Sequence, residues 1–285
     1  MKTKIVVTVC LLLLSASAFS QAKADNNTKP VQPQRAQKAP AEACVEDPIL
    51  PTDGSSAQDI VSTGSGGTGP NYYLVHLKAG HSYSAEMWAP TSDNSPVTGG
   101  AQLALLLNPN CSLVATSDFV GIDPDLTNSF ADRISWHFQN NHDFTLEASS
   151  LDTSGTLYQY LIRVTDTTLW NTNWSTSSTL AMQYDFTNVT AATLSGELTV
   201  TDVTGGNTTY TSSFSVAPGQ QVTKIVAATG IASIGLQVPA NHQGYASFAF
   251  LGPAGAVVAD ANFINNTTPN VPVAPSKFEP RFYPH

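Results

Sequence analysis

Charged side chains are scarce in this chain. Of its 285 residues, 12% are charged and 41% are hydrophobic. The hydrophobic residues fall in short periodic runs that can bury a core, so the low charge does not indicate disorder. A chain of this length forms one large domain or two ordinary ones.

Basic residues are the scarcer charged type beyond residue 43. There, six basic residues stand against 19 acidic ones, which gives a net charge of −13. Binding to nucleic acid requires a basic surface that neutralises phosphates, so we predict no nucleic-acid partner. An acidic body is compatible with cations, with neutral glycans or with solubility alone.

The sequence lacks an apolar run long enough to cross a membrane comfortably. The run Ile5–Leu14 follows Lys2 and Lys4 and precedes a series of small residues. This order is that of a secretory signal peptide, and the run is too short for a bilayer span. We therefore predict a signal peptide over residues 1–22, no membrane span after its removal, and a secreted or periplasmic location.

Cysteines are few. There are three, and Cys10 lies in the predicted signal peptide, which leaves Cys44 and Cys111. Two cysteines in an oxidising compartment are more often bridged than free, so we predict a Cys44–Cys111 disulfide. A zinc site would need further ligands at short spacing, and the sequence offers none nearby.

Sequence motifs of hydrolases are missing. No Gly-X-Ser-X-Gly elbow adjoins an apolar strand and helix, and no His-Glu-X-X-His occurs. His137 and His142, five residues apart, form either a metal pair or the two ends of a solvated hairpin. A glycosidase carboxylate pair cannot be recognised from sequence, because its separation is spatial. We predict that the protein is not an enzyme, with a secreted hydrolase as the minor alternative.

Alternating patterns in the first half predict strands. Residues 71–88 alternate with period two on both sides of Gly80, which is typical of a β-hairpin. The apolar run Leu103–Leu107 predicts a strand that is buried on both faces. Further strand patterns, at the spacing of a β-sandwich, occupy residues 133–138, 144–148 and 158–164.

Together these segments resemble the bacterial pre-peptidase C-terminal domain, a small secreted β-sandwich. The matching segments are YYLVHLKAGHSYSAEMW, LALLLNPN, the Asp118 that follows Thr116 and Ser117, DRISW, DFTLEA and LYQYLIRV. The resemblance covers residues 71–164 and implies a non-catalytic accessory module. Some members of that family bind calcium. This chain departs from the usual setting, because no catalytic domain precedes the module.

The second half predicts another sandwich. Period-two alternation occupies residues 194–201, 210–216, 246–250 and 257–263. Pro218 and Gly219 stand where a type II turn places them. We expect an all-β chain with two tandem β-sandwich domains, residues 44–166 and an immunoglobulin-like 167–285, after a Pro/Ala/Gln-rich linker over residues 23–43.

The end of the chain, from Asn265, is polar and rich in proline. Its aromatic residues Phe278, Phe282 and Tyr283 either pack back on the second domain or form a small recognition patch. We favour packing.

One acidic segment stands out between the strand patterns. Asp118, Asp123, Asp125 and Asp132 lie within fifteen residues that we expect to form a loop. Calcium takes several oxygen ligands from flexible loops, and the spacing of Asp123 and Asp125 lets two carboxylates converge. These four aspartates are therefore candidate calcium ligands, and a solvated acidic loop is the alternative. We predict no other cofactor.

The function expected from the sequence is binding or presentation at the cell exterior. The partner is an extracellular glycan, protein or surface, and a structural envelope or matrix role is the alternative. Exposed aromatic rows would favour a glycan, because sugar rings stack on flat aromatic faces. The residues that decide this are Tyr72, Trp88, Trp136, Trp170 and Trp174, for which core packing is the alternative.

Overall fold

The computed structural model describes most of the chain after residue 47. The described ranges are 48–61, 70–88, 101–108, 111–116, 118–122, 130–150, 158–231, 235–265, 272–277 and 279–280. They all belong to the compact unit that spans residues 39–285. The predicted signal peptide and linker lie outside the described residues.

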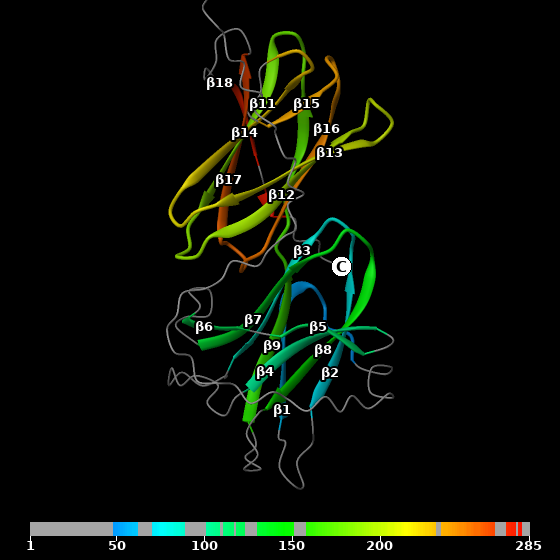
Figure 1. Cartoon of the computed structure of the whole chain (residues 1–285), viewed down its shortest axis with the longest axis vertical. Coiled ribbons are helices and arrows are strands. Elements are labelled where there is room, and N and C mark those ends of the chain that lie inside the picture. Colours follow the sequence, from blue (N-terminus) through cyan, green and yellow to red (C-terminus); the bar gives the residue numbers. More distant parts are fainter. Residues whose placement is uncertain are drawn as a thin grey trace, which may run out of the picture. The chain divides into compact units, whose positions relative to one another are not determined.

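The first half of the chain forms two antiparallel sheets (Figure 1). The five-stranded sheet has the order β1 (Asp53–Val61), β9 (Tyr158–Asp166), β3 (Ser82–Trp88), β7 (Phe130–His137) and β6 (Asp118–Ile122). The four-stranded sheet has the order β2 (Asn71–Leu77), β8 (His142–Ser150), β4 (Ala101–Leu107) and β5 (Ser112–Thr116).

The core of this first sandwich comes from the inner faces of both sheets. In β2, Tyr73, Val75 and Leu77 are buried and His76 is exposed, as the alternation predicted. They pack with inward residues of β3, β4, β7, β8 and β9 in one cluster. Residues 103–106 of β4 are all buried, which confirms the prediction of a strand covered on both faces.

The prediction of a hairpin over residues 71–88 is wrong. β2 pairs with β8, whereas β3 pairs with β7 and β9 in the opposite sheet. Gly80, with a φ of 75°, lies in a turn in which His81 N donates to the Lys78 carbonyl at 3.3 Å. β3 is buried at every position except Trp88. A strand with so little exposed surface needs a neighbour on each side, so it occupies the centre of the other sheet.

The second half also forms two sheets. One has the order β13 (Thr208–Val216), β12 (Leu194–Asp202), β16 (Gln243–Phe250), β10 (Leu169–Ser175) and β19 (Glu279–Pro280). The other has the order β15 (Leu236–Val238), β14 (Gln221–Ala228), β11 (Leu180–Asn188), β17 (Val257–Asn265) and β18 (Pro272–Lys277). β10 and β11 lie in opposite sheets, whereas the immunoglobulin arrangement places its first two strands in one sheet.

An aromatic core holds these two sheets together. The rings of Phe186 in β11 and Phe248 in β16 stack with their centroids 4.2 Å apart, which joins the sheets directly. Fully buried Trp174 donates its indole N–H to the Tyr245 carbonyl at 3.0 Å. The turn predicted at Pro218 and Gly219 is present, because Gln220 N donates to the Ala217 carbonyl at 3.0 Å.

The backbone of the proline-rich C-terminal segment packs on the second sandwich. β18 pairs with β17, and β19 pairs with β10 in the opposite sheet. Proline cannot donate to a ladder and is therefore confined to sheet edges, where both strands lie. The predicted contacts of Phe278, Phe282 and Tyr283 lie outside the described residues.

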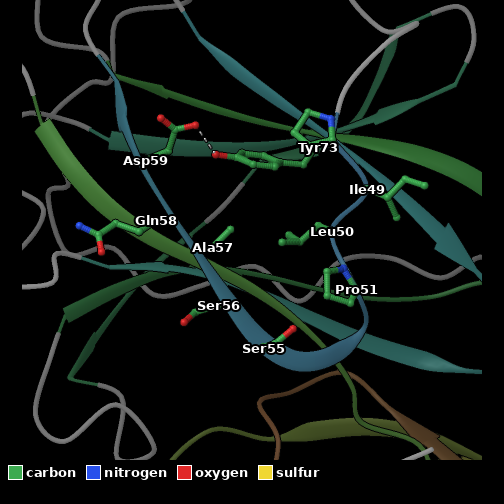
Figure 2. Close-up of a pocket in the computed structure, with 10 residues that line it drawn as sticks. Ile49, Leu50, Pro51, Ser55, Ser56, Ala57, Gln58, Asp59 and Tyr73 are labelled. Atoms are coloured by element: carbon green, nitrogen blue, oxygen red, sulfur yellow. Dashed lines mark hydrogen bonds between the residues drawn. The ribbon is translucent and has the colours of Figure 1, made fainter. Parts of the chain in front are cut away.

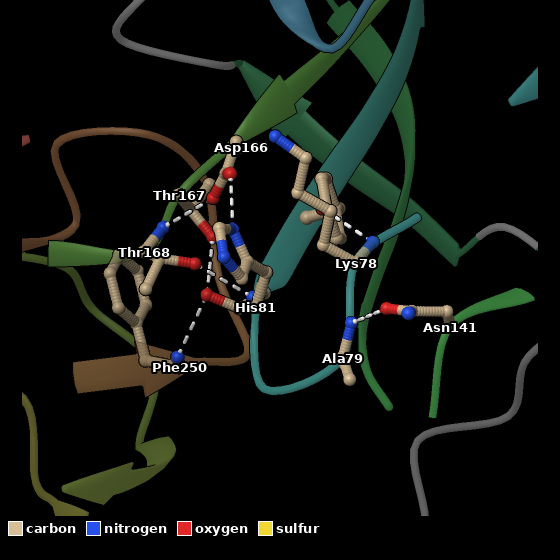
Figure 3. A network of polar contacts seen from close by, with 10 residues as sticks. Lys78, Ala79, His81, Asn141, Asp166, Thr167, Thr168 and Phe250 are labelled. Atoms are coloured by element: carbon tan, nitrogen blue, oxygen red, sulfur yellow. Dashed lines mark hydrogen bonds and ion pairs between the residues drawn. The ribbon is translucent and has the colours of Figure 1, made fainter. Parts of the chain in front are cut away.

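A polar network surrounds the turn between β2 and β3 (Figure 3). His81 Nδ1 lies 2.6 Å from Asp166 Oδ2, and Thr168 N donates to the other oxygen of that carboxylate at 3.0 Å. The Ser82 hydroxyl contacts the Thr167 hydroxyl at 2.9 Å and accepts a hydrogen bond from Phe250 N at 3.1 Å. These contacts fix the segment in which the chain passes from β9 to β10.

The predicted fold class is confirmed. The described residues form strands and connecting turns without helices, in sheets that pair as β-sandwiches and whose named strands are antiparallel neighbours except for the parallel pair β14 and β15. In that part of the chain, no helix is long and apolar enough to traverse a bilayer.

Candidate functional site

A pocket opens at one edge of the first sandwich, between β1 and the segment Pro48–Pro51 (Figure 2). We call it the Asp59 pocket. Its volume is about 380 Å³, and β1 and β2 beside it are end strands of their sheets. Its lining residues are Pro48, Ile49, Leu50, Pro51, Ser55, Ser56, Ala57, Gln58, Asp59 and Tyr73. The site therefore lies where both sheets end.

The segment on one side of the pocket is held by the edge of β2. Leu74 N donates to the Pro48 carbonyl at 3.1 Å, and Leu50 N donates to the Leu74 carbonyl at 2.9 Å. Ile49 thus pairs in parallel with Leu74 and leaves its side chain 63% exposed, while Leu50 is buried in the core. One wall of the pocket is therefore apolar and fixed by backbone hydrogen bonds.

A chain of buried hydroxyl groups places the carboxylate in the pocket. The Tyr73 hydroxyl donates to Asp59 Oδ2 at 3.1 Å and lies 2.6 Å from the Tyr160 hydroxyl. Because the proton of Tyr73 goes to Asp59, Tyr160 is the donor to Tyr73, and Tyr160 in turn accepts from Asn71 Nδ2 at 2.8 Å. The chain runs from Asn71 through Tyr160 and Tyr73 to Asp59, and it connects the two sheets.

The phenols of this chain stay protonated. Burial raises the pKa of Tyr73 far above its ordinary value, and the Asp59 carboxylate raises it further. Burial also raises the pKa of Tyr160. Neither phenol can serve as an anionic base or nucleophile near neutral pH. Their role in this arrangement is to orient Asp59 and to close the edge of the core.

The structure describes two of the four predicted calcium ligands, Asp118 and Asp132, which lie at neighbouring positions of the paired strands β6 and β7. The expectation of one loop over residues 118–132 is wrong at both ends, because Asp118 begins β6 and Asp132 lies within β7, where its side chain is buried. Asp118 is paired with Arg133 in the sheet register. Asp123 and Asp125 lie outside the described residues. Elsewhere in the described chain, no three His, Cys, Asp or Glu side chains form a metal-binding group.

Of the two cysteines in the predicted disulfide, the structure describes Cys111. Cys111 is partly buried and packs against Ala104 and Leu106 of β4. Cys44 lies outside the described residues. The Cys44–Cys111 disulfide therefore stays a prediction.

The candidate aromatic residues for a glycan do not form one exposed row. Trp136 and Trp174 are core residues, while Tyr72, Trp88 and Trp170 are half-buried. The Arg163 guanidinium lies over the Trp88 ring, 5.4 Å from its centroid. Trp170 contacts the rings of His81 and Tyr245.

The histidines make carboxylate pairs that the sequence did not predict. Nδ1 lies 2.6 Å from a carboxylate oxygen in each of the pairs His76–Asp143, His81–Asp166 and His242–Asp202. Within the described residues, none of these imidazoles has a Ser, Thr or Cys partner at its other nitrogen, as a nucleophilic triad would require. His137 and His142 end β7 and begin β8, which lie in different sheets, so they do not flank a hairpin.

The Asp59 pocket was missed from the sequence because its residues carry no motif. Asp59 and Tyr73 lie 14 residues apart, and Tyr160 follows 87 residues after Tyr73. The one available signal is a charged residue beside the apolar pair Ile60 and Val61. That signal gives no partner, because the partner lies on a distant strand.

Comparison with known proteins places the chain in no established family. No family model matches it, and no curated protein matches it. A solved structure with some likeness is a candidate secreted protein from Eubacterium rectale, with 8% identity over 69% of each chain and a TM-score of 0.24. A likeness at that level supports no functional argument.

Proposed function

We propose that this is a secreted, non-catalytic binding or accessory protein, and that the Asp59 pocket is its ligand site. The observation that carries the proposal is the pocket itself. It combines an apolar wall with an exposed carboxylate that two buried tyrosines hold in place. Pockets that join apolar surface to a few oriented polar groups are the usual ligand sites of proteins.

Several features support binding rather than catalysis. The pocket lining contains one carboxylate, that of Asp59. The phenol of Tyr73, which also lines the pocket, stays neutral. The lining has no imidazole or thiol that would pair with the hydroxyls of Ser55 or Ser56. The resemblance of residues 71–164 to the pre-peptidase C-terminal domain belongs to the same proposal, because that family consists of accessory modules.

Export is part of the proposal and rests on the N-terminal pattern of charge, apolar run and small residues. We expect the mature protein in the medium or the periplasm, with an N-terminus near residue 23. N-terminal sequencing of the recovered protein tests this. Mature protein that retains Met1 in the cytoplasm would contradict export.

Binding at the pocket is tested by filling it. Ala57→Leu adds bulk to the lining, and Ala259→Leu is the matched control, since both alanines are partly buried against a core. Wild type and both variants are tested against soluble polysaccharides and random peptides, and for hydrolysis of peptide, ester and glycan substrates. We expect binding that Ala57→Leu abolishes and Ala259→Leu retains. Hydrolysis abolished by Asp59→Asn in a folded variant would overturn the non-catalytic function.

A further inference from the structure

We infer that the ligand of the Asp59 pocket is an extended peptide that pairs with the outer edge of β1. This inference rests on the proposed function and adds the class of ligand. The peptide would extend the five-stranded sheet by one strand and place a side chain in the pocket.

The edge of β1 supplies the backbone part of the site. β1 is the end strand of its sheet and pairs with β9. In an antiparallel ladder, alternate residues direct their N–H and C=O groups away from the neighbour, so the outer edge carries a row of donors and acceptors. The register with β9 is continuous from Ser56 to Val61, and no other strand of the described chain pairs with this edge. An extended peptide matches such a row.

The sequence of this edge does not block pairing. Proteins protect exposed edges with proline, charged side chains and above all lysine, bulges or very short strands. β18, an end strand of the second sandwich, carries two prolines and Lys277 in the sequence PVAPSK. β1 has an irregular register between Asp53 and Ser56, and from Ser56 onward it reads SAQDIV, without proline or lysine and with Asp59 as its one charged residue. The one protective feature from Ser56 to Val61 is therefore the charge of Asp59, which a basic side chain of the peptide would neutralise.

The pocket supplies the side-chain specificity. Ala57 and Asp59 lie two residues apart on β1, so they share one face of the strand about 7 Å apart. Ala57 packs on the apolar core, and Asp59 is held by the Tyr73 hydroxyl. A paired peptide would place one side chain beside Ala57 and the next side chain of that face beside Asp59. The expected ligand pattern is a small apolar residue and a lysine or arginine separated by one residue.

The lining favours a peptide over a glycan. The one aromatic ring in the lining, Tyr73, is 4% exposed, so a sugar ring has no aromatic face on which to stack. Residues 44–285 carry a net charge of −13, and an acidic body attracts a basic ligand and repels an acidic one.

The test is selection from a phage library of random nine-residue linear peptides on immobilised mature protein. We expect enriched sequences with the apolar-X-basic spacing. Asp59→Asn should lower the affinity of the best peptide on the order of tenfold, because one charged contact is lost. Asp260→Asn removes an exposed carboxylate from the second sandwich and should leave the affinity unchanged. Thermal unfolding of each variant checks that it is folded.

Backbone pairing is tested separately by N-methylation of the selected peptide. Methyl groups on alternate residues should abolish binding in one register and be tolerated in the other, because a β-strand pairs through one edge. Equal tolerance of both registers, or selected peptides that bind Ala57→Leu as tightly as wild type, would overturn the inference. Pocket-dependent binding of soluble polysaccharides without any peptide binder would overturn the peptide class and retain the proposed function. If neither probe set binds, both proposals fail.

Discussion

Arg163 Nη2 lies 2.6 Å from Glu86 Oε2 inside the five-stranded sheet of the first sandwich. Arg133 Nε approaches the other carboxylate oxygen at 2.9 Å. The Glu86 side chain is 2% exposed, so one carboxylate is enclosed between two guanidinium groups from neighbouring strands. A buried charge of this kind is tolerated because it is paired on both sides.

The first prediction concerns this carboxylate. Glu86→Gln should lower the free energy of unfolding by about 3 kcal/mol, because two partly buried guanidinium groups lose their counter-charge. Urea unfolding of the variant and of the exposed control Asp260→Asn measures the difference. A Glu86→Gln variant as stable as the control would show that water satisfies both arginines.

The second prediction concerns the hydroxyl chain under the pocket. Tyr73→Phe leaves the Tyr160 proton without its acceptor and should lower the free energy of unfolding by about 1 to 3 kcal/mol. Tyr160→Phe should cost a similar amount, and the double variant should cost less than the sum, because the two groups share one hydrogen bond. Chemical denaturation of the set checks this, with Tyr245→Phe as an exposed control. Losses in the free energy of unfolding that add up in the double variant would contradict a connected chain of hydroxyl groups.

The third prediction is the response to alkaline pH. The pKa values of Tyr73, Tyr83, Tyr160 and Tyr184 are raised above 10.0, chiefly by burial. The unfolded state therefore releases protons near pH 10 that the folded state retains. The contribution of these four tyrosines to the free energy of unfolding is complete below pH 10 and falls as the pH rises. Ultraviolet absorbance should show exposed tyrosines ionising first and these four ionising together with loss of the sheet signal in circular dichroism. A single smooth titration of all nine tyrosines in folded protein would contradict it.

The fourth prediction is the Cys44–Cys111 disulfide. Closing a loop of this length should stabilise the protein by about 4 kcal/mol in the chain-entropy model. Reduction should therefore lower the unfolding midpoint, and mass spectrometry of unreduced digests should find the linked peptides. Alkylation of both thiols in native, unreduced protein would rule the bridge out.

The fifth prediction is weak calcium binding by the acidic segment around Asp123 and Asp125. Clustered carboxylates repel one another, and a bound cation relieves that repulsion. Calcium should raise the melting temperature, chelator should lower it, and Asp123→Asn with Asp125→Asn should remove the response. A melting curve unmoved by millimolar calcium, with no heat of binding, would leave the segment as solvated acidic residues.

Strand positions could be predicted from the sequence, but strand partners could not. The alternation of Tyr73, Val75 and Leu77 fixes which side chains face the core, because side chains alternate along any strand. Nothing in that pattern states that β2 pairs with β8 instead of β3. Pairing depends on which distant strands cover both faces, as the nearly complete burial of β3 shows.

The candidate site was hidden for a related reason. Tyr73 and Tyr160 have the pattern of ordinary core residues, and their contact with Asp59 depends on three strands meeting at one edge. Trp136 and Trp174 also have no sequence signal that separates a core tryptophan from an exposed one. Composition and the N-terminal pattern indicate where the protein is expected to work, while the ligand site follows from tertiary contacts.

The two short C-terminal strands have a consequence for how the protein is made. β19 pairs with β10, the first strand of the second sandwich, and β18 pairs with β17 in the opposite sheet. The ribosome must therefore have passed Lys277 before the sheet that ends in β18 is complete, and Pro280 before the sheet that ends in β19 is complete. β10 and β19 are distant in the sequence, and pairing between such segments is intrinsically slow, since a long loop must close first. The second sandwich is therefore expected to stay open until its last strand has been made.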